Sequence, residues 1–341
     1  MKKYKICKIL LVILAIFLCV VFYESFGICI AYKKQPEVSN TIKKETQNDS
    51  WNERSENMER AVIIEKNPEA LLQRVRLIRN AKEDIILSTF AFQSDESGKL
   101  ILGALHDAAD RGVHIRLLVD GMESWIDMEG NPYFYGLSSH ENVEIKLYNK
   151  ANPLKPWKMM GRMHDKYLIA DGKRYILGGR NTYNYFLGDF PGHKNYDRDV
   201  LVVCDEPEKE NSVNQLLEYF ETIWEQEDSG YFHDNKKLAN RKSVKNAVLE
   251  LQNGYQKYFE ENKERICDTD YTDETFETEK IALVSNPIHT GSKEPVVWYQ
   301  LGELMKNAKE RVKIHTPYII CNDMMYNTWE EIAQKVPDFS I

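Results

Sequence analysis

The stretch Met163–Asn181, MHDKYLIADGKRYILGGRN, contains two apolar-rich runs separated by a turn signal. Lys166–Ala170 and Arg174–Leu177 have the length and composition of short strands, and Asp171-Gly172-Lys173 lies between them. An Asp-Gly pair favours a tight turn because both residue types tolerate a positive φ. The sequence therefore predicts a β-hairpin at the centre of the fold.

The ends of this hairpin carry side chains suited to an anionic ligand. Side chains alternate along a strand, so His164 and Lys166 are expected to project from the same face. A nucleophile or proton carrier beside a fixed positive charge suits a phosphate group. After the second strand, Gly178 and Gly179 allow a close approach of backbone to a ligand, and Asn181 adds an amide donor.

Composition sets the size of the fold and its charge. The chain has 341 residues, 43% of them hydrophobic, enough for one large core and parts of two domains. Its net charge of −8 argues against a general nucleic-acid-binding protein. The window Lys150–Arg198 differs, with ten Lys or Arg against four Asp or Glu. Because this excess surrounds the hairpin, it favours an anion-attracting cleft over a solvated basic face.

No metal site or cofactor is predicted. The six cysteines form no C-x-x-C pair, and the eight histidines form no H-x-x-x-H or H-x-H set.

The N-terminus has the composition of a membrane segment. Four lysines come at the start, and Ile6–Tyr23 is close to the ~20 residues that a span needs. A cleaved signal peptide shares this pattern, but Cys29-Ile30-Ala31 is a poor cleavage site, which favours an uncleaved anchor. The lysines ahead of the span predict a single-pass protein of the cell membrane whose catalytic domain is extracytoplasmic.

A β-α-β unit precedes the hairpin. Ile85–Phe92 and Val113–Val119 have the pattern of buried strands, and Glu96–Arg111 has an apolar helical stripe. Strand, helix and strand with short links predict an α/β fold with a parallel or mixed sheet. A helix from Asn67 to about Lys82 precedes this unit. A long loop is expected after the strand Val113–Val119, before the hairpin.

An internal repeat defines the later part of the chain. Asn80-Ala81-Lys82-Glu83 recurs as Asn307-Ala308-Lys309-Glu310, at an offset of 227 residues, with a helix before and a strand after each copy. Phe339-Ser340-Ile341 then corresponds to the start of the strand Val113–Val119. By this offset the counterpart of His164 is expected near position 391, about fifty residues beyond Ile341.

Shifts in composition predict five segments. They are an anchor or signal peptide at 1–32, a polar linker at 33–60, a first domain at 61–226, a charged connector at 227–279, and an incomplete second repeat at 280–341.

Taken together, His164-x-Lys166-x-x-x-x-Asp171 and Gly178-Gly179-x-Asn181 resemble the HKD motif of the phospholipase D superfamily. The GGRN tail, the aromatic segment Tyr183–Phe190 and the run DRDVLVV at Asp197–Val203 are most similar to bacterial cardiolipin synthase-type members. The resemblance covers residues 61–341. It implies a mixed sheet flanked by helices, with one complete repeat and the start of a second.

The resemblance also implies a reaction on phosphodiesters through a covalent phosphohistidine. His164 would be the nucleophile or the general acid, while Lys166 and Asn181 would hold phosphate oxygens. Asp171 would act as a structural and electrostatic partner. Asp197 or Asp199 resembles the downstream acid that orients the histidine.

The same resemblance assigns substrate binding to the GGRN tail, through Gly178, Gly179 and Arg180. The expected partners are a phospholipid membrane and an anionic phospholipid substrate, and nucleic acid is not favoured. Members of the superfamily bring two HKD motifs together, whereas this sequence contains one. Three explanations stay open: a truncated chain, which we favour, a second chain that supplies the other motif, or an inactive protein.

Three functions follow from these observations. The first is a membrane-anchored phospholipid enzyme that transfers or hydrolyses phosphatidyl groups. The second is a metal-independent phosphodiesterase acting on nucleic acid, and the third is an inactive lipid-binding remnant.

Overall fold

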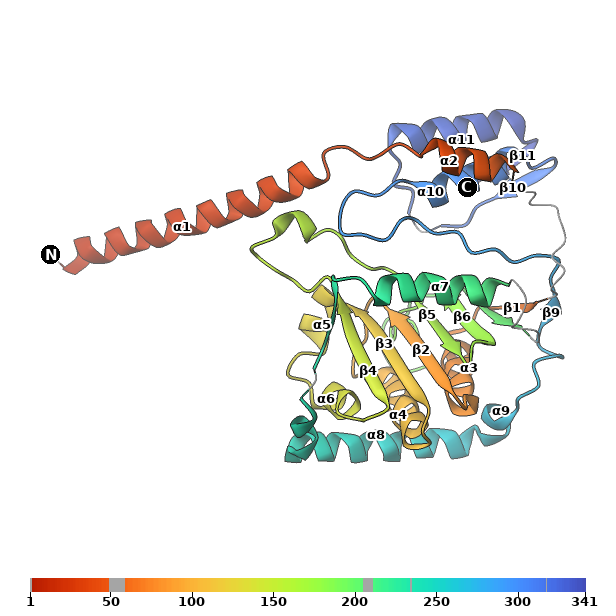
Figure 1. Ribbon diagram of the computed structural model, residues 1–341, viewed down its shortest axis with the longest axis horizontal. Coiled ribbons are helices and arrows are strands. Elements are labelled where there is room, and N and C mark those ends of the chain that lie inside the picture. The colour runs from red at the N-terminus through yellow and green to blue at the C-terminus, as the bar shows by residue number, and fades with distance from the viewer. Residues whose placement is uncertain (1, 49–58, 205–210, 234, 317) are drawn as a thin grey trace.

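The computed structural model describes residues 2–48, 59–204, 211–233, 235–316 and 318–341, and its centre is a nine-stranded mixed sheet (Figure 1). Helices flank the sheet on both faces, so the predicted fold class is confirmed. The strands, in spatial order, are β8 (Ser229–Tyr231), β4 (Val143–Tyr148), β3 (His114–Asp120), β2 (Asp84–Thr89), β5 (Tyr167–Ala170), β6 (Arg174–Gly178), β7 (Asp199–Val203), β1 (Arg60–Ile64) and β9 (Phe276–Glu277).

The middle of the sheet separates two hydrophobic cores. β2, β3 and β4 are parallel to one another, and β5 and β6 form the predicted antiparallel hairpin beside β2. Along β2, Ile85 and Leu87 point into one core and Ile86 into the other, since alternate side chains face opposite sides. These strands are apolar throughout because both of their faces are covered.

Helices of the first half complete the two outer layers. The larger core lies under α3 (Asn67–Asn80) and α4 (Glu96–Asp110), and the smaller one under α7 (Ser212–Trp224). Helix α3 has proline in its first turn, as the sequence predicts, and Asp95 caps α4 by accepting from the Gly98 N–H.

The predicted long loop before the hairpin was wrong. It contains the helices α5 (Gly121–Asp127) and α6 (Pro132–Ser138) as well as strand β4. In β4, Val143, Ile145 and Leu147 alternate with more exposed residues, which is the period-two signal of a strand with one buried face.

The predicted connector 227–279 is instead a structural part of the first domain. β8 and β9 form the two edges of the main sheet. Helix α8 (Lys242–Glu261) lies across α4 and α6 (Figure 1), and α9 (Lys263–Cys267) follows it. The charges of α8 lie on its outer face. Its buried side chains recur at helical spacing, at Val244, Ala247, Leu251, Tyr255 and Phe259.

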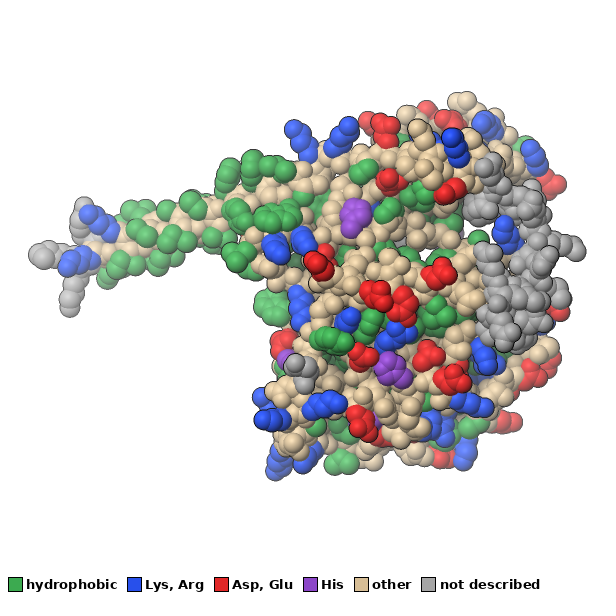
Figure 2. Space-filling model, viewed as in Figure 1, with side chains coloured by type: hydrophobic (Ala, Val, Ile, Leu, Met, Phe, Trp, Pro, Cys, Tyr) green, Lys and Arg blue, Asp and Glu red, His purple; other side chains and the backbone are tan. Residues whose placement is uncertain are grey.

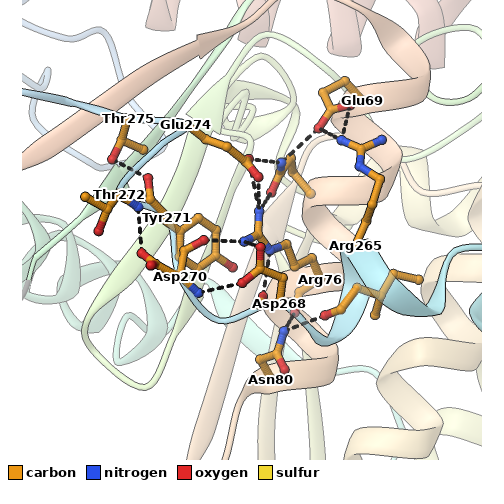
Figure 3. A network of polar contacts seen from close by, with 12 residues as sticks. Glu69, Arg76, Asn80, Arg265, Asp268, Asp270, Tyr271, Thr272, Glu274 and Thr275 are labelled. Carbon is orange, nitrogen blue, oxygen red and sulfur yellow. Dashed lines mark hydrogen bonds and ion pairs between the residues drawn. The ribbon is translucent and has the colours of Figure 1, made fainter.

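A buried arginine on α3 fastens the end of this segment (Figure 3). The Arg76 guanidinium donates to the carbonyl oxygens of Asp268 and Asp270, at 2.8 and 2.7 Å. It also pairs with Glu274 at 3.0 Å and lies 3.9 Å from the Tyr271 ring centroid. A charge this deeply buried is stable only where such partners surround it. The segment is therefore held to α3 by specific contacts.

The last part of the chain repeats the order of elements seen at the start of the domain. It contains α10 (Val296–Lys306), β10 (Arg311–Lys313), α11 (Asp323–Lys335) and β11 (Asp338–Ser340). β10 and β11 are parallel, as β2 and β3 are. Helix α11 begins 227 residues after α4, which equals the offset of the sequence repeat, and Asn322 caps it as Asp95 caps α4.

Helix α1 (Lys2–Ala31) extends away from this body (Figure 1). Within the described ranges it is the one helix long and apolar enough to cross a membrane. The predicted linker is partly ordered, because α2 (Asn40–Asn48) follows and Val38 and Thr46 are buried. The Ser39 N–H donates to Glu294, which ties this part to the second repeat. Residues 49–58 of the linker lie outside the described residues.

Candidate active site

A pocket of about 380 Å3 opens at the end of the hairpin where β5 begins and β6 ends. His164 and Lys166 line it from the segment that enters β5, and Gly178 lines it from the end of β6. Residues of the second repeat, including Asn286 and Lys293, form the facing wall. The pocket therefore lies between the two halves of the chain.

His164 is an exposed side chain held between an aromatic ring and a cation. Its ring centroid lies 4.6 Å from that of Phe90, at the end of β2. Its Nδ1 lies 3.0 Å from the Lys166 Nζ. Desolvation, and then the charge of Lys166, lower the pKa of His164 below 6.5, against an opposite effect of Asp120. The imidazole is therefore largely neutral near neutral pH.

Lys166 is the buried cation of the pocket. Its side chain donates to the His164 carbonyl oxygen at 2.7 Å, which directs the ammonium back toward the imidazole. Desolvation lowers the pKa of Lys166 to about 8, while the carboxylates of Asp165, Asp197 and Asp120 act in the opposite direction. A cation in such a place gains most from a bound anion, because little water competes for it.

Asp120 positions the segment that carries His164, and sequence reasoning missed it. It is fully buried at the end of β3, where it caps α5. Its carboxylate accepts from the Met163 N–H at 3.1 Å and forms an ion pair with Arg162. The signal was available, since a carboxylate at the carboxyl end of a parallel strand lies where such folds place their ligand sites.

Two predicted residues lie close to this pair. Asn181 accepts from the Ala91 N–H through its Oδ1 at 3.2 Å, which places its amide next to Phe90. The negative charge of Asp197 reaches Lys166. Asp197 also lies against Gly179, where an added Cβ would fall 2.1 Å from its Oδ2. Of the two candidate acids, Asp197 is therefore the one whose charge acts on Lys166.

A second ionisable cluster also lines the pocket. The Asp165 carboxylate accepts from the Tyr219 hydroxyl at 2.7 Å, and burial raises the pKa of Asp165. Desolvation lowers the pKa of Lys293, and the charge of Asp165 opposes that shift. Among the described residues, no three His, Cys, Asp or Glu side chains gather in a way that could hold a metal ion.

A family comparison agrees with this geometry. Residues 74–224 match the family described as "Cardiolipin synthase, PLD-like domain". This part of the chain belongs to the phospholipase D superfamily.

The curated relatives that this chain matches are distant from it in sequence and are longer. It is 27% identical over 309 residues to an uncharacterized protein of Helicobacter pylori (strain ATCC 700392 / 26695), covering 82% of this chain and 58% of that protein. It is 29% identical over 171 residues to cardiolipin synthase C of Escherichia coli K12, covering 46% and 34%. The chain thus spans less than two thirds of the length of each relative.

A solved structure shares the fold. The phosphatidylserine synthase of Haemophilus influenzae Rd KW20 aligns with a TM-score of 0.55 at 15% identity, covering 86% of this chain and 64% of that chain.

The HKD aspartate, which we expected to be a structural and electrostatic partner, does not line the pocket. Asp171 follows β5, at the opposite end of the hairpin from His164. Its carboxylate accepts from the backbone N–H groups of residues 82–84, at 2.9 to 3.2 Å. With a φ of 51° it also forms the turn itself. Asp171 therefore fastens the turn to the start of β2 and has a structural role.

Asp199 and Arg180 belong to the core, so their predicted roles in catalysis and substrate binding were wrong. Asp199 is 2% exposed and pairs with Arg74 at 3.0 Å and Arg180 at 3.2 Å. Arg180 is 1% exposed and also donates to the carbonyl oxygens of Ile64 and Glu65. These ions are matched within the protein, and burial separates them from a ligand.

The two glycines of the tail leave room for the carboxylates of Asp197 and Asp199. The sequence instead predicted that these glycines contact a ligand. A Cβ on Gly178 would lie 2.0 Å from the Asp199 Oδ1, and one on Gly179 would lie 2.1 Å from the Asp197 Oδ2. Only glycine leaves room for a carboxylate at each position. Gly178 still lines the pocket, but through this packing requirement.

Proposed function

We propose that this chain acts on the phosphodiester bonds of phospholipids through a phosphohistidine formed on His164, as a membrane-anchored phosphatidyl transferase or hydrolase of the cardiolipin synthase type. The observation that carries the proposal is the contact of a neutral imidazole with the buried ammonium of Lys166 in one pocket. Helix α1 supports the choice of lipid, because an anchor would keep the pocket near headgroups.

The chemistry follows from the two side chains. His164 attacks phosphorus, an N–P bond forms, and the P–O bond to the first alcohol breaks. Lys166 and the amide of Asn181 stabilise the charge that develops on the phosphate oxygens. An acceptor alcohol or water then gives its proton to the group that protonated the first alcohol and attacks phosphorus, and the N–P bond breaks. Phosphate binding also gives the ammonium a stronger acceptor than Nδ1, which releases the imidazole for attack.

The first leaving oxygen needs a proton. Two-motif members of the superfamily obtain it from a second histidine, and this sequence has one HKD motif. We therefore propose that a second motif completes the site, and a second chain could supply it. If a second copy supplies it, turnover per protein rises with protein density in vesicles, whereas a site complete within one chain gives constant turnover.

Product analysis tests the reaction. The full chain is reconstituted into phosphatidylglycerol vesicles, and lipids are separated by mass spectrometry. Cardiolipin with free glycerol indicates transfer, and phosphatidic acid with free glycerol indicates hydrolysis. His164→Ala should abolish both, because no nucleophile is left. His114→Ala is the matched control, because His114 is also exposed but lies at the opposite end of β3 from Asp120.

Two results would contradict the proposal. One is product formation that His164→Ala leaves unchanged. The other is a strong preference for nucleic acid, seen as chelator-resistant cleavage of DNA by the same preparation with no lipid product.

The location is proposed on the same terms. The lysines at the start of α1, which precede most of its apolar residues, favour an extracytoplasmic body. Cys267 and Cys321 are exposed on that body, so a membrane-impermeant maleimide should label both in intact spheroplasts. Replacing both with serine should remove that label from the body. Labelling only after lysis would reverse the orientation.

A further inference from the structure

The segment Lys150–Arg162, which joins β4 to the catalytic segment, has an unusual surface. It contains four Lys or Arg and no Asp or Glu. Three large apolar residues in it remain exposed: Leu154 at 75%, Met160 at 59% and Trp157 at 45%. Single exposed apolar residues are ordinary, but three within seven positions, interleaved with cations, form a patch that needs a partner.

This segment packs against α1. The Tyr23 hydroxyl of α1 donates to the Leu154 carbonyl oxygen at 2.9 Å. Gly27 of α1 lies so close to η1 (Pro156–Lys158) that an added Cβ would fall 2.5 Å from the Pro156 side chain. In Figure 1 the segment projects from the sheet toward α1, and Figure 2 shows the green surface of α1 reaching the body beside blue side chains. The exposed patch is therefore continuous with the helix that can cross a membrane.

Two of the four cations of the segment form ion pairs. Arg162 pairs with Asp120, and Lys158 with Asp228 at 2.6 Å. Lys150 donates to the Tyr231 carbonyl oxygen, an uncharged partner, and Lys155 is a further cation of the segment. This surplus suits anionic headgroups, which attract basic residues beside a membrane span.

We propose that Lys150–Arg162 is an interfacial loop that inserts Leu154, Trp157 and Met160 into the headgroup region of a bilayer containing anionic phospholipid. Tryptophan favours this region because its ring is apolar and its N–H is polar. The loop continues directly into Met163 and His164, so the bilayer surface and the pocket share one segment. A lipid headgroup could thus pass from the bilayer to His164 along this loop. The inference rests on the proposed membrane location but not on the proposed reaction.

Tryptophan quenching tests the insertion. The full chain is reconstituted into vesicles of phosphatidylcholine and phosphatidylglycerol, some of them brominated on the acyl chain near the headgroup. Bromine quenches tryptophans that reach this depth. Trp157→Phe should remove a quenched component of the emission. Trp224→Phe should leave that component unchanged, because Trp224 is 7% exposed within the core of α7.

Each outcome decides the inference. Equal quenching of the wild type and Trp157→Phe, in protein that resists alkaline extraction from the vesicles, would overturn the loop insertion alone. Protein that alkali extracts would overturn both the anchor and the loop. Cross-linking between copies at Trp157→Cys, together with unquenched Trp157, would assign the patch to a second copy instead. Loss of lipid turnover without a change in quenching leaves the loop standing and concerns the reaction only.

Discussion

The proposed reaction needs His164 without its second proton and Lys166 with its proton, so the two residues favour opposite changes of pH. His164 must be neutral to attack, and its pKa is lowered below 6.5. Lys166 must be charged to hold phosphate, and its pKa is about 8. Log kcat/KM should therefore rise with pH below 6.5, as His164 loses its proton, which is the acid limb of the profile. It should fall again near pH 8, as Lys166 loses its proton, which is the basic limb.

Lys166→Arg isolates the second limb. Arginine keeps its charge across this range, so the fall near pH 8 should disappear while the acid limb remains. Lys309→Arg, a change at an exposed residue that does not line the pocket, serves as the control and should keep both limbs. A basic limb unchanged in Lys166→Arg would show that another group controls it.

The neighbouring glycines predict two different defects from the same substitution. Gly178→Ala would press on Asp199 in the core and should lower the free energy of unfolding by about 1–3 kcal/mol. Gly179→Ala would displace Asp197, whose charge raises the pKa of Lys166. It should cut kcat/KM by about 10-fold or more and move the basic limb to lower pH. Urea unfolding and pH profiles separate the two, and identical behaviour would contradict the different roles of the aspartates.

At the scale of elements, the hairpin is fastened at one end and reactive at the other. Asp171→Ala removes the acceptor of three backbone N–H groups and leaves alanine at a positive φ, so stability should fall by about 1–3 kcal/mol. Asp171→Asn keeps an acceptor and tolerates this φ, so it should lose less. Both variants should keep kcat well below their melting temperatures. A loss of kcat as complete as in His164→Ala would return Asp171 to the catalytic set.

Helix α8 tests whether residues 227–279 belong to the first domain. Leu251 is 1% exposed, and its carbonyl oxygen lies where a Cβ on Gly103 of α4 would approach to 2.7 Å. Leu251→Ala should lower the free energy of unfolding by about 2–5 kcal/mol. Leu249, on the same helix, is 57% exposed, and Leu249→Ala should stay within about 0.5 kcal/mol. Equal, small losses in urea unfolding would make α8 a loosely attached segment.

At the scale of the whole molecule, the second repeat closes the pocket. Lys293 reaches the same cavity as His164 from a segment that is more than a hundred residues away in sequence. A partly desolvated ammonium there should attract the anionic substrate. Lys293→Gln should therefore raise KM for phosphatidylglycerol by about 10- to 100-fold, as the loss of one charged hydrogen bond implies, with less effect on kcat. Lys309→Gln is the matched control. An effect on kcat alone would place Lys293 in the chemical step.

Local patterns in the sequence were enough for the parts of the fold that depend on neighbouring residues. The Asp171-Gly172 turn, the β-α-β unit and the contact of His164 with Lys166 follow from turn chemistry, periodicity and short spacing. The offset of the sequence repeat also equals the separation between the starts of α4 and α11, 227 residues. The missed strand β4 was also a local signal, because apolar and charged residues alternate along it.

Only the tertiary structure decided which polar residues share the site. Asp120 reaches Arg162 across 42 positions, and Asp199 pairs with an arginine 125 positions away on α3. Asp171 belongs to the motif by spacing, yet a strand separates it from the pocket. Spacing along the chain does not determine these distances, because they depend on sheet order and on which charges are buried together. The sequence by itself determined the reactive pair and its hairpin, and the packing of sheet and repeat decided what surrounds them.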